Sequence, residues 1–508
     1  MNCEKCGNKL GENTKFCVIC GNERKTEVNK IQKEDIIIHT EAGLKDGRLG
    51  CPNCGAPDIK YSEKRGKLYC SYCNSTFDGK TLDGVLNDLS NLEGNRIGSG
   101  ARNIKADAKD IITLACGSCG AEIVIDTKTS TQARCHWCRS VLSINSRIEN
   151  GAVPDAILPF KIQKDEAKKE IEKFVGKRQF YALPAFKKEF TTENIMGVYF
   201  PYMLIDAKAH GNFYGQGEHQ TRRYTSNKRT YYDAKLYHVG RDFDITIDNL
   251  TVESNKDRLD KTKESKTNNI INSIMPFDVE NCIKFQSNYL VGYTSEKRDI
   301  NIDELKPKVD KQLNDVVRHA INKDLNYYDR GIKWSHESVD LIGTQWIAAY
   351  LPVWLYSYYE NKNGKQVLHY VAVNARTKET MGSVPINKAK LFLISAIIEL
   401  FSVFIGLSIF LNSEGDEAPI VILIFLFMSG FIYHKVMTSK YRNKKARHTY
   451  EKETKTMMTN IKREDHYIQD RKRLSSRRMV GANNTRLDGD NVHISKGIVE
   501  ETADKFIK

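Results

Sequence analysis

The chain has 508 residues, of which 78 are Lys or Arg and 64 are Asp or Glu, so its formal net charge is +14. Its mean hydropathy of −0.51 excludes a polytopic membrane transporter. The length exceeds that of one ordinary domain, and we expect about three or four folding units. The positive charge suits an anionic partner, either nucleic acid or the inner face of a membrane.

The cysteines are concentrated at the N-terminal end of the chain. Twelve of the 13 cysteines stand in CxxC pairs within the first 138 residues. No apolar signal segment precedes them, so we expect metal sites in a reducing compartment rather than a disulfide framework. The remaining cysteine, Cys282, stands alone; we expect a small core or surface residue, with a reactive thiol as the alternative.

The paired cysteines form three quartets, which predict zinc ribbons over residues 1–22, 49–79 and 113–148. Each CxxC turn directs two thiolates at one tetrahedral metal, and a β-hairpin returns the second pair. Four sulfurs leave no open position, so three structural Zn²⁺ ions are expected; thiol redox pairs are the disfavoured alternative. The predicted ligands are Cys3, Cys6, Cys17, Cys20, Cys51, Cys54, Cys70, Cys73, Cys116, Cys119, Cys135 and Cys138.

Two polar segments separate the quartets, at residues 23–48 and 80–112. They are rich in Lys, Asp, Asn and Gly. We interpret them as linkers, or short helices, that have no core of their own.

Residues 152–387 carry long apolar-patterned segments that repeat. ILPF at 157–160 resembles IMPF at 274–277, and VYFPYMLI at 198–205 resembles AYLPVWLY at 349–356. We therefore predict a duplicated α+β region, in which each half runs from a Pro-Phe entry through a helix to a Tyr-x-Pro strand.

The second half of this region has the clearest local patterns. Residues 303–325 predict a helix, with Pro307 expected in its first turn. Asn363-Gly364 predicts a tight hairpin turn after the Tyr-x-Pro strand, and the charged residues 256–269 predict a solvated loop. The apolar face of the helix is predicted from residues recurring every fourth position: Leu305, Val309, Leu313, Val317 and Ile321.

Residues 389–437 are predicted to form a transmembrane hairpin of two helices. Residues 391–411 contain one charge, Glu399, and 21 residues at about 1.5 Å each span a bilayer core of about 30 Å. The second apolar run, 418–433, is short enough that alone it could be a buried or interfacial helix. Lys and Arg flank the outer ends, so we expect a two-span protein of the cell membrane with both termini cytoplasmic.

The fold class expected from these segments is therefore multidomain: small β zinc ribbons, a duplicated α+β middle region and a C-terminal transmembrane helical hairpin. A basic cytoplasmic tail, residues 438–508, follows and is expected to be partly helical. Its charge serves either to bind anionic lipid or only to fix the topology.

Several polar residues have two interpretations. Glu399 suits helix packing better than ion or proton transport, because one hairpin makes no pathway. His210, His219 and His238 lie in a predicted β region and could form a second metal site, although satisfied or exposed histidines are favoured.

The basic residues of the second and third ribbons also have two interpretations. They could form a nucleic-acid surface on which Trp137 stacks, or a solvated face with Trp137 packed beside the metal knuckle, which we favour. The residues concerned are Lys60, Lys64, Arg65, Lys67, Arg134, His136, Trp137 and Arg139.

The sequence lacks the GxxxxGK[ST], HExxH, GxSxG and nucleotide-binding GxGxxG motifs, so we expect no enzyme and no ATP-driven helicase. With three ribbons, ILPF, VYFPYMLI, SIMPFDVENCIKFQSNYLVGY and YLPVWLYSYYENKNG, the chain resembles the TFIIB-type zinc-ribbon membrane proteins of Gram-positive bacteria, which include YdjG-like proteins. The resemblance covers roughly residues 50–440. Members are often labelled primosomal helicase-like, a label that the missing phosphate loop does not support.

The resemblance implies zinc at the quartets that begin at Cys51 and Cys116, and a membrane-bound partner of envelope-stress proteins related to phage shock protein A. The first ribbon looks like a separate module added in front. Our leading hypothesis is a membrane-anchored adaptor that recruits cytoplasmic or membrane-associated proteins. The alternatives are a membrane-tethered nucleic-acid binder and an enzyme in the tyrosine-rich middle region.

Overall fold

The structure is a computed structural model of the chain. It describes residues 2–11, 14–24, 35–38, 51–56, 59–80, 82, 89–102, 111–115, 121–126, 135–137, 147–148, 154–226, 229–254, 274–296, 298, 300–362, 365–412, 428–442 and 461–482.

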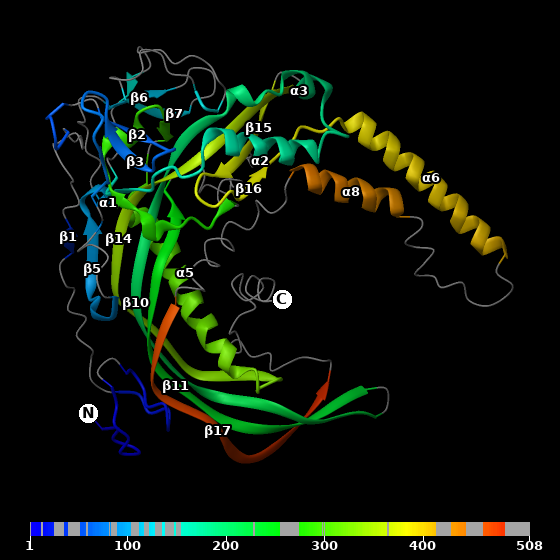
Figure 1. Cartoon of the computed structure of the whole chain (residues 1–508). Helices are drawn as coiled ribbons and strands as arrows, with labels where there is room; N and C mark the ends of the chain where they lie inside the picture. The colour runs from blue at the N-terminus through cyan, green and yellow to red at the C-terminus, as the bar shows by residue number, and fades with distance from the viewer. Residues whose placement is uncertain are drawn as a thin grey trace.

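Three long strands dominate the fold: β10 (Met196–Ser226), β11 (Arg229–Glu253) and β14 (Gly331–Lys362). They run antiparallel and curve side by side, with β10 between the other two (Figure 1). Register shifts along β10 mark bulges, which bend a strand and increase its twist. These bulges let strands of about 30 residues curve rather than extend flat.

Shorter strands extend this unit into a 14-stranded sheet. β14 and β15 form a hairpin in which Lys362 lies opposite Lys365, which confirms the predicted position of the connection. The shorter strands with bounds are β6 (Ile111–Ala115), β7 (Glu122–Asp126), β8 (Arg147–Ile148), β9 (Ala156–Ile157), β12 (Ile283–Lys284), β13 (Thr294–Glu296), β15 (Lys365–Asn374) and β16 (Thr380–Gly382).

Helix α5 (Ile302–Asn322) lies across the inside of the curved strands (Figure 1). All five residues predicted for its apolar face are buried, together with Val316. They pack in one core with Phe213, Phe243 and Trp334 of the long strands. The helix begins at Ile302, so Pro307 lies in the second turn rather than the first. Each buried aliphatic side chain contributes about 1.5–3 kcal/mol, so this face holds the helix in place.

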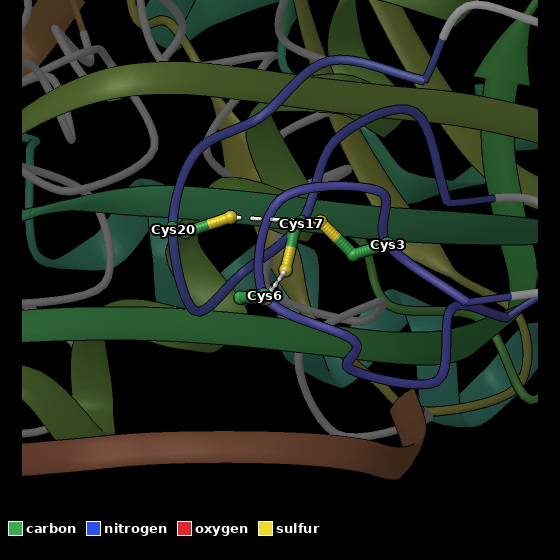
Figure 2. Close-up of side chains that lie close together, drawn as sticks. All are labelled: Cys3, Cys6, Cys17 and Cys20. Carbon is green, nitrogen blue, oxygen red and sulfur yellow. Dashed lines mark hydrogen bonds between the residues drawn. The ribbon is translucent and has the colours of Figure 1, made fainter.

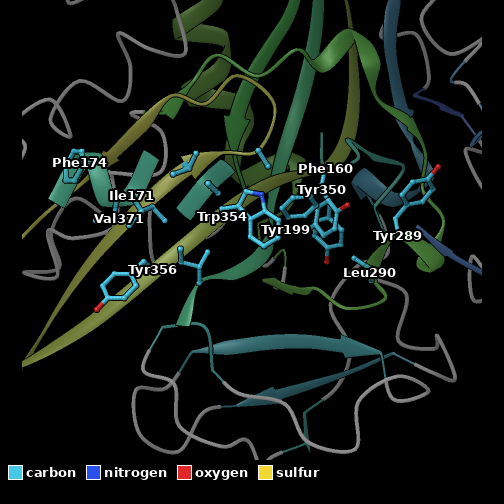
Figure 3. Close-up of a cluster of buried hydrophobic side chains, with 14 of the residues drawn as sticks. Phe160, Ile171, Phe174, Tyr199, Tyr289, Leu290, Tyr350, Trp354, Tyr356 and Val371 are labelled. Carbon is cyan, nitrogen blue, oxygen red and sulfur yellow. The ribbon is translucent and has the colours of Figure 1, made fainter. Parts of the chain in front are cut away.

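A second core lies near the other end of the sheet. Helices α2 (Lys164–Gly176) and α3 (Pro184–Glu189) pack there against the sheet. Figure 3 shows its centre, where Phe160, Tyr199, Tyr350 and Trp354 lie together. The Phe160 ring meets those of Tyr199 and Trp354 edge to face, at centroid distances of 5.0 Å. Short 3-10 turns complete the fold: η1 (Leu89–Asn91), η3 (Thr192–Asn194), η5 (Val279–Asn281), η6 (Ser287–Leu290) and η7 (Lys323–Leu325).

The two segments predicted to be linkers contribute strands to the main sheet, which corrects that prediction. β5 (Gly94–Gly98) pairs in parallel with β14, and β1 (Ile36–Ile38) pairs with β5. The short helix α1 (Ser99–Arg102) follows, and the Gly100 N–H donates to the buried Asp155 carboxylate at 2.6 Å. β5 supplies hydrogen-bonding partners to backbone groups of β14 that are far away in the sequence. A short apolar run such as that of β1 does not predict a pairing of this kind.

The basic tail also differs from expectation. Residues Ile461–Ala482 form strand β17, which pairs antiparallel with β11, where a partly helical tail was predicted. The neighbouring strand supplies hydrogen-bonding partners that the local sequence does not reveal. The predicted loop 256–269 lies outside the described residues.

Helix α6 (Lys388–Asn412) projects from the body with α8 (Ser429–Arg442) beside it (Figure 1). Among the described residues, one helix is long and apolar enough to cross a membrane, over Lys388–Ser408. Only 17% of its most apolar stretch is buried inside the protein, and Phe392, Leu400 and Phe404 are exposed. A core helix would bury these side chains. Most of the second predicted span lies outside the described residues.

Candidate metal centre

Four sulfurs of the first quartet meet at one point (Figure 2). The Sγ atoms of Cys3 and Cys20 lie 3.6 Å apart, and those of Cys6 and Cys17 lie 3.5 Å apart. Burial raises the pKa of Cys17 to about 12, so a bound cation would have to displace its proton.

The second quartet has the same geometry and an additional hydroxyl. The Sγ atoms of Cys51 and Cys73 lie 3.6 Å apart, as do those of Cys54 and Cys70. The Ser75 hydroxyl lies 2.9 Å from the sulfur of Cys73 and 3.4 Å from that of Cys51. It lowers the pKa of both thiols, that of Cys51 to about 6. Sequence reasoning missed Ser75; its position two residues after a ligand cysteine is the available signal.

Each described CxxC turn is closed by a residue with positive φ. Gly7, Gly21, Gly55 and Asn74 follow the second cysteine of each pair, with φ between 60° and 73°. Their N–H groups donate to the first cysteine's carbonyl at 2.8–2.9 Å. Glycine and asparagine tolerate this left-handed conformation, so the C-x-x-C-G and C-x-x-C-N sequences directly specify the turns that aim the sulfurs.

This arrangement fits zinc. Tetrahedral Zn–S bonds of about 2.3 Å imply sulfur–sulfur distances of about 3.8 Å. Within each described quartet, all four sulfurs lie within 4.8 Å of one another. Four-sulfur sites suit a structural Zn²⁺ ion and leave no position for water. In the second quartet, strands β2 (Ile59–Ser62), β3 (Lys67–Cys70) and β4 (Thr76–Phe77) form a small sheet that returns the second CxxC pair, as predicted.

Of the third quartet, only Cys135 lies among the described residues, and it is buried. Cys116, Cys119 and Cys138 lie outside them, so the third site stays a prediction.

The first ribbon is packed on the outside of the long strands, which differs from the separate module that we expected. The Thr14 hydroxyl donates to the Asp242 carboxylate at 2.9 Å, and the Lys15 ammonium lies 2.5 Å from the Asp340 carboxylate. A Cβ atom on Gly240 would lie 2.5 Å from the Val18 carbonyl oxygen. The ribbon backbone therefore rests directly on β11, at a position where a side chain would obstruct it.

The second ribbon is also joined to the body. The Tyr61 hydroxyl donates to the Phe160 carbonyl at 2.6 Å, and the Asn288 amide donates to the Ile59 carbonyl at 3.2 Å. Tyr293 donates to Glu63, whose pKa is raised by burial. Unfolding of either ribbon would therefore remove contacts with the body of the protein.

Trp137 is buried, as our preferred interpretation predicted, whereas the solvated face that it also predicted is not found at His136. Its indole N–H donates to Glu296, and its ring contacts Phe200 and Tyr370 edge to face. His136 is also buried, 3.3 Å from the same carboxylate. Neither side chain can therefore stack on a base. Arg134 and Arg139 lie outside the described residues.

The remaining candidate residues have protein partners. His210 Nδ1 donates to the Asp244 carboxylate at 2.8 Å, His219 Nδ1 donates to the Tyr327 carbonyl at 2.9 Å, and His238 Nε2 donates to the Ile19 carbonyl at 2.8 Å. The contacts of His219 and His238 agree with satisfied histidines, whereas the buried Nε2 of His210 lacks a hydrogen-bond partner among the described residues and lies 3.7 Å from the Asp242 carboxylate. Burial raises the pKa of Cys282 well above its ordinary value, which agrees with a core thiol.

Glu399 contacts the neighbouring helix. Its carboxylate accepts a hydrogen bond from the Gly430 N–H at 2.6 Å, at the start of α8. A Cβ atom on Gly430 would lie 2.3 Å from the Ser395 carbonyl oxygen, so the two helices approach closely there. The contact supports the helix-packing interpretation, because a carboxylate satisfies free N–H groups at a helix start.

Comparison with known proteins yields one distant relative to report. The chain is similar to the uncharacterized protein YdjG of Bacillus subtilis (strain 168), with 25% identity over 342 residues. The match covers 67% of this chain and 90% of that protein. No protein-family model and no solved structure matches the chain. The relative's name states no activity.

Proposed function

We propose that this protein is a membrane-anchored zinc-ribbon adaptor that recruits cytoplasmic proteins to the membrane. One combination carries the proposal: closed four-sulfur sites and an exposed apolar helix stand on the same folded body. A four-sulfur site has no open coordination position, so its metal stabilises the fold of the ribbon and does not activate water. An exposed helix of this length suits a bilayer, where its apolar side chains lose contact with water.

The second ribbon supplies a surface suited to a partner. Tyr72 lies between two ligand cysteines and is 75% exposed, and the β2–β3 turn of the same ribbon exposes Lys64 and Arg65. Tyrosine and arginine are enriched in the energetically important centres of protein interfaces. The resemblance described above implies a partner related to phage shock protein A.

The finer parts of the proposal follow from the sequence. A third zinc ion is held by the quartet that begins at Cys116, and a second span completes a hairpin with α6. Both termini face the cytoplasm, because the flanking Lys and Arg residues stand at the outer ends of the hairpin. The Tyr-x-Pro halves arose by duplication of one α+β unit.

Proximity labelling from the intact chain in its native cell tests the adaptor role. A tyrosine-to-alanine change at Tyr72 should reduce labelling of a specific protein set, while the protein stays in the membrane fraction. The matched control is Ile36→Ala, which removes an exposed apolar side chain of β1, outside the ribbons and the projecting helices. If Tyr72→Ala and the parent label the same proteins at the same level, the ribbon is not the recruiting surface.

The purified full-length chain tests the nucleic-acid alternative, which the positive net charge favours. Binding to DNA or RNA is measured against salt concentration. A binder that neutralises several phosphates weakens steeply as salt rises. Absence of binding, or a flat response to salt, rejects this alternative.

A further inference from the structure

Residues 177–183, which connect α2 to α3, pack against the start of α6 and the end of α8, where the helix pair joins the body. The Asn387 N–H, just before α6, donates to the Tyr181 carbonyl at 2.8 Å. The Arg178 guanidinium donates to the Lys440 carbonyl, near the end of α8, at 3.1 Å. The connection therefore lies level with the point at which the helices leave the body.

This connection presents an exposed aromatic ring. Phe180 is 59% exposed, and the Lys390 ammonium lies 3.9 Å from its ring centroid. The same ammonium donates to the Phe180 carbonyl at 2.9 Å. On α6 the exposed apolar surface continues with Phe392 and Leu393, which are 69% and 61% exposed. Phe180 thus stands at the foot of the apolar surface.

The segments that meet at the base of the helix pair are rich in basic residues. Within residues 177–190, 384–392 and 428–441, the only acidic residue is Glu189. The basic residues of these ranges that are exposed are Lys177, Lys187, Lys188, Lys388, Lys435 and Lys440. We call this set, together with Phe180 and Lys390, the juxtamembrane collar.

We propose that the juxtamembrane collar docks on anionic phospholipid headgroups, with Phe180 inserted at headgroup depth. The inference rests on the proposed membrane anchoring by α6. Aromatic rings concentrate at the membrane–water boundary, and lysines next to a span attract acidic lipids. An acidic protein would match the charge, but the lipid surface also accounts for an exposed ring continuous with the apolar face of α6. Docking would fix the tilt of the curved sheet relative to the membrane.

The full chain carrying Phe180→Trp provides a direct probe. The four natural tryptophans, Trp137, Trp334, Trp346 and Trp354, are all buried, so they give a low quenchable background. The protein is reconstituted in vesicles of phosphatidylcholine with brominated acyl chains, with and without phosphatidylglycerol. We expect a blue shift and loss of the added emission, stronger with phosphatidylglycerol. The matched control, Tyr72→Trp on the second ribbon, should stay unquenched.

Charge removal tests headgroup recognition. Lys177→Gln, Lys388→Gln and Lys440→Gln, added to the Phe180→Trp chain, should each weaken the phosphatidylglycerol response about fivefold. Flotation of the vesicles after an alkaline wash reports anchoring separately. A chain that fails to float overturns the anchor and the collar with it. A chain that floats with an unquenched indole, or with quenching independent of phosphatidylglycerol, overturns the collar alone.

Discussion

Tyr199 of the first Tyr-x-Pro segment lies directly opposite Pro352 of the second in the β10–β14 ladder. Pro201 lies opposite Tyr350 in the same way, so the two segments pair with each other about a local twofold axis. Proline cannot donate to a ladder, yet both prolines stand in the most buried part of these strands. Side-chain packing therefore has to stabilise this junction, and Tyr199 is one of its fully buried aromatic residues.

Tyr199→Ala should destabilise the protein by about 3–5 kcal/mol, as large aromatic-to-alanine changes in cores do. The change removes edge-to-face contacts with Phe160 and Tyr293. Tyr199→Phe keeps the ring and is the matched control, expected to stay within about 1 kcal/mol of the parent. Denaturant midpoints of the two variants measure the difference. Equal midpoints would show that the junction tolerates a cavity.

Cys17→Ser should lower the zinc bound per chain by one ion, because it removes one of four sulfurs. Cys282→Ser is the control, since Cys282 is a buried cysteine outside the quartets and its replacement should leave the zinc content unchanged. Elemental analysis of the purified chains gives both ratios. Zinc loss in the Cys282 variant, or none in the Cys17 variant, contradicts the assignment.

Gly240→Ala should detach the first ribbon from the sheet without emptying its metal site. The added methyl group would meet the carbonyl oxygen of Val18, between Cys17 and Cys20, and the three atoms nearest to it include no sulfur. Hydrogen exchange should increase in residues 14–24, with zinc content unchanged. Gly176→Ala, where nothing lies within 4 Å, is the matched control. Unchanged exchange in the Gly240 variant would show that the ribbon is not held at β11.

Features that depend on neighbouring residues were predictable from the sequence. The CxxC spacing and the following Gly or Asn specify each described sulfur turn within a few positions. The burial of Leu305 and Ile321 on α5 follows from a four-residue period, and Asn363-Gly364 marks the connection between β14 and β15. In each case the interacting residues lie close together along the chain.

Features that depend on distant partners were not predictable. Thr14 meets Asp242 across 228 positions, and no periodicity reports such a contact. β1, β5 and β17 are strands because unpaired edges of the sheet accept them. The sequence left two interpretations of Trp137 open. In the structure the indole of Trp137 is buried and donates to Glu296, which is 159 positions away in the sequence.

Asp206→Asn should stabilise the protein increasingly as pH rises. Asp206 is buried, and desolvation raises its pKa to about 7 despite hydrogen bonds from the Asn249 N–H and Gln345. A raised folded-state pKa means that stability is fully present below about pH 4 and is lost as pH rises through about 7. The neutral amide removes this loss, which is on the order of 4 kcal/mol. Thermal midpoints at pH 5 and pH 8 measure it: the variant's advantage should be larger at the higher pH, and a constant offset would contradict the assignment.

Glu399→Ala should loosen α8 from α6, because it removes the acceptor for the Gly430 N–H. Loss of such a helix-start acceptor costs about 1 kcal/mol in water, and an unsatisfied N–H costs more in an apolar environment. Glu399→Gln retains an acceptor oxygen and should retain most of the packing. Hydrogen exchange over residues 428–433 should therefore increase in the alanine variant and change little in the glutamine variant.

The same pair of Glu399 variants separates packing from proton transport. A packing role predicts no proton flux into vesicles that contain the parent chain, and the same absence for Glu399→Gln. A transport role predicts flux in the parent that Glu399→Gln abolishes, because an amide does not carry a proton between the two sides. The Glu399 carboxylate accepts from a backbone N–H of the neighbouring helix. A relay would also need a second titratable group, and in the described part of the chain His434 contacts the Ser395 hydroxyl, at 3.4 Å, rather than Glu399. We therefore expect exchange to respond to the alanine variant while the flux stays at the level of empty vesicles.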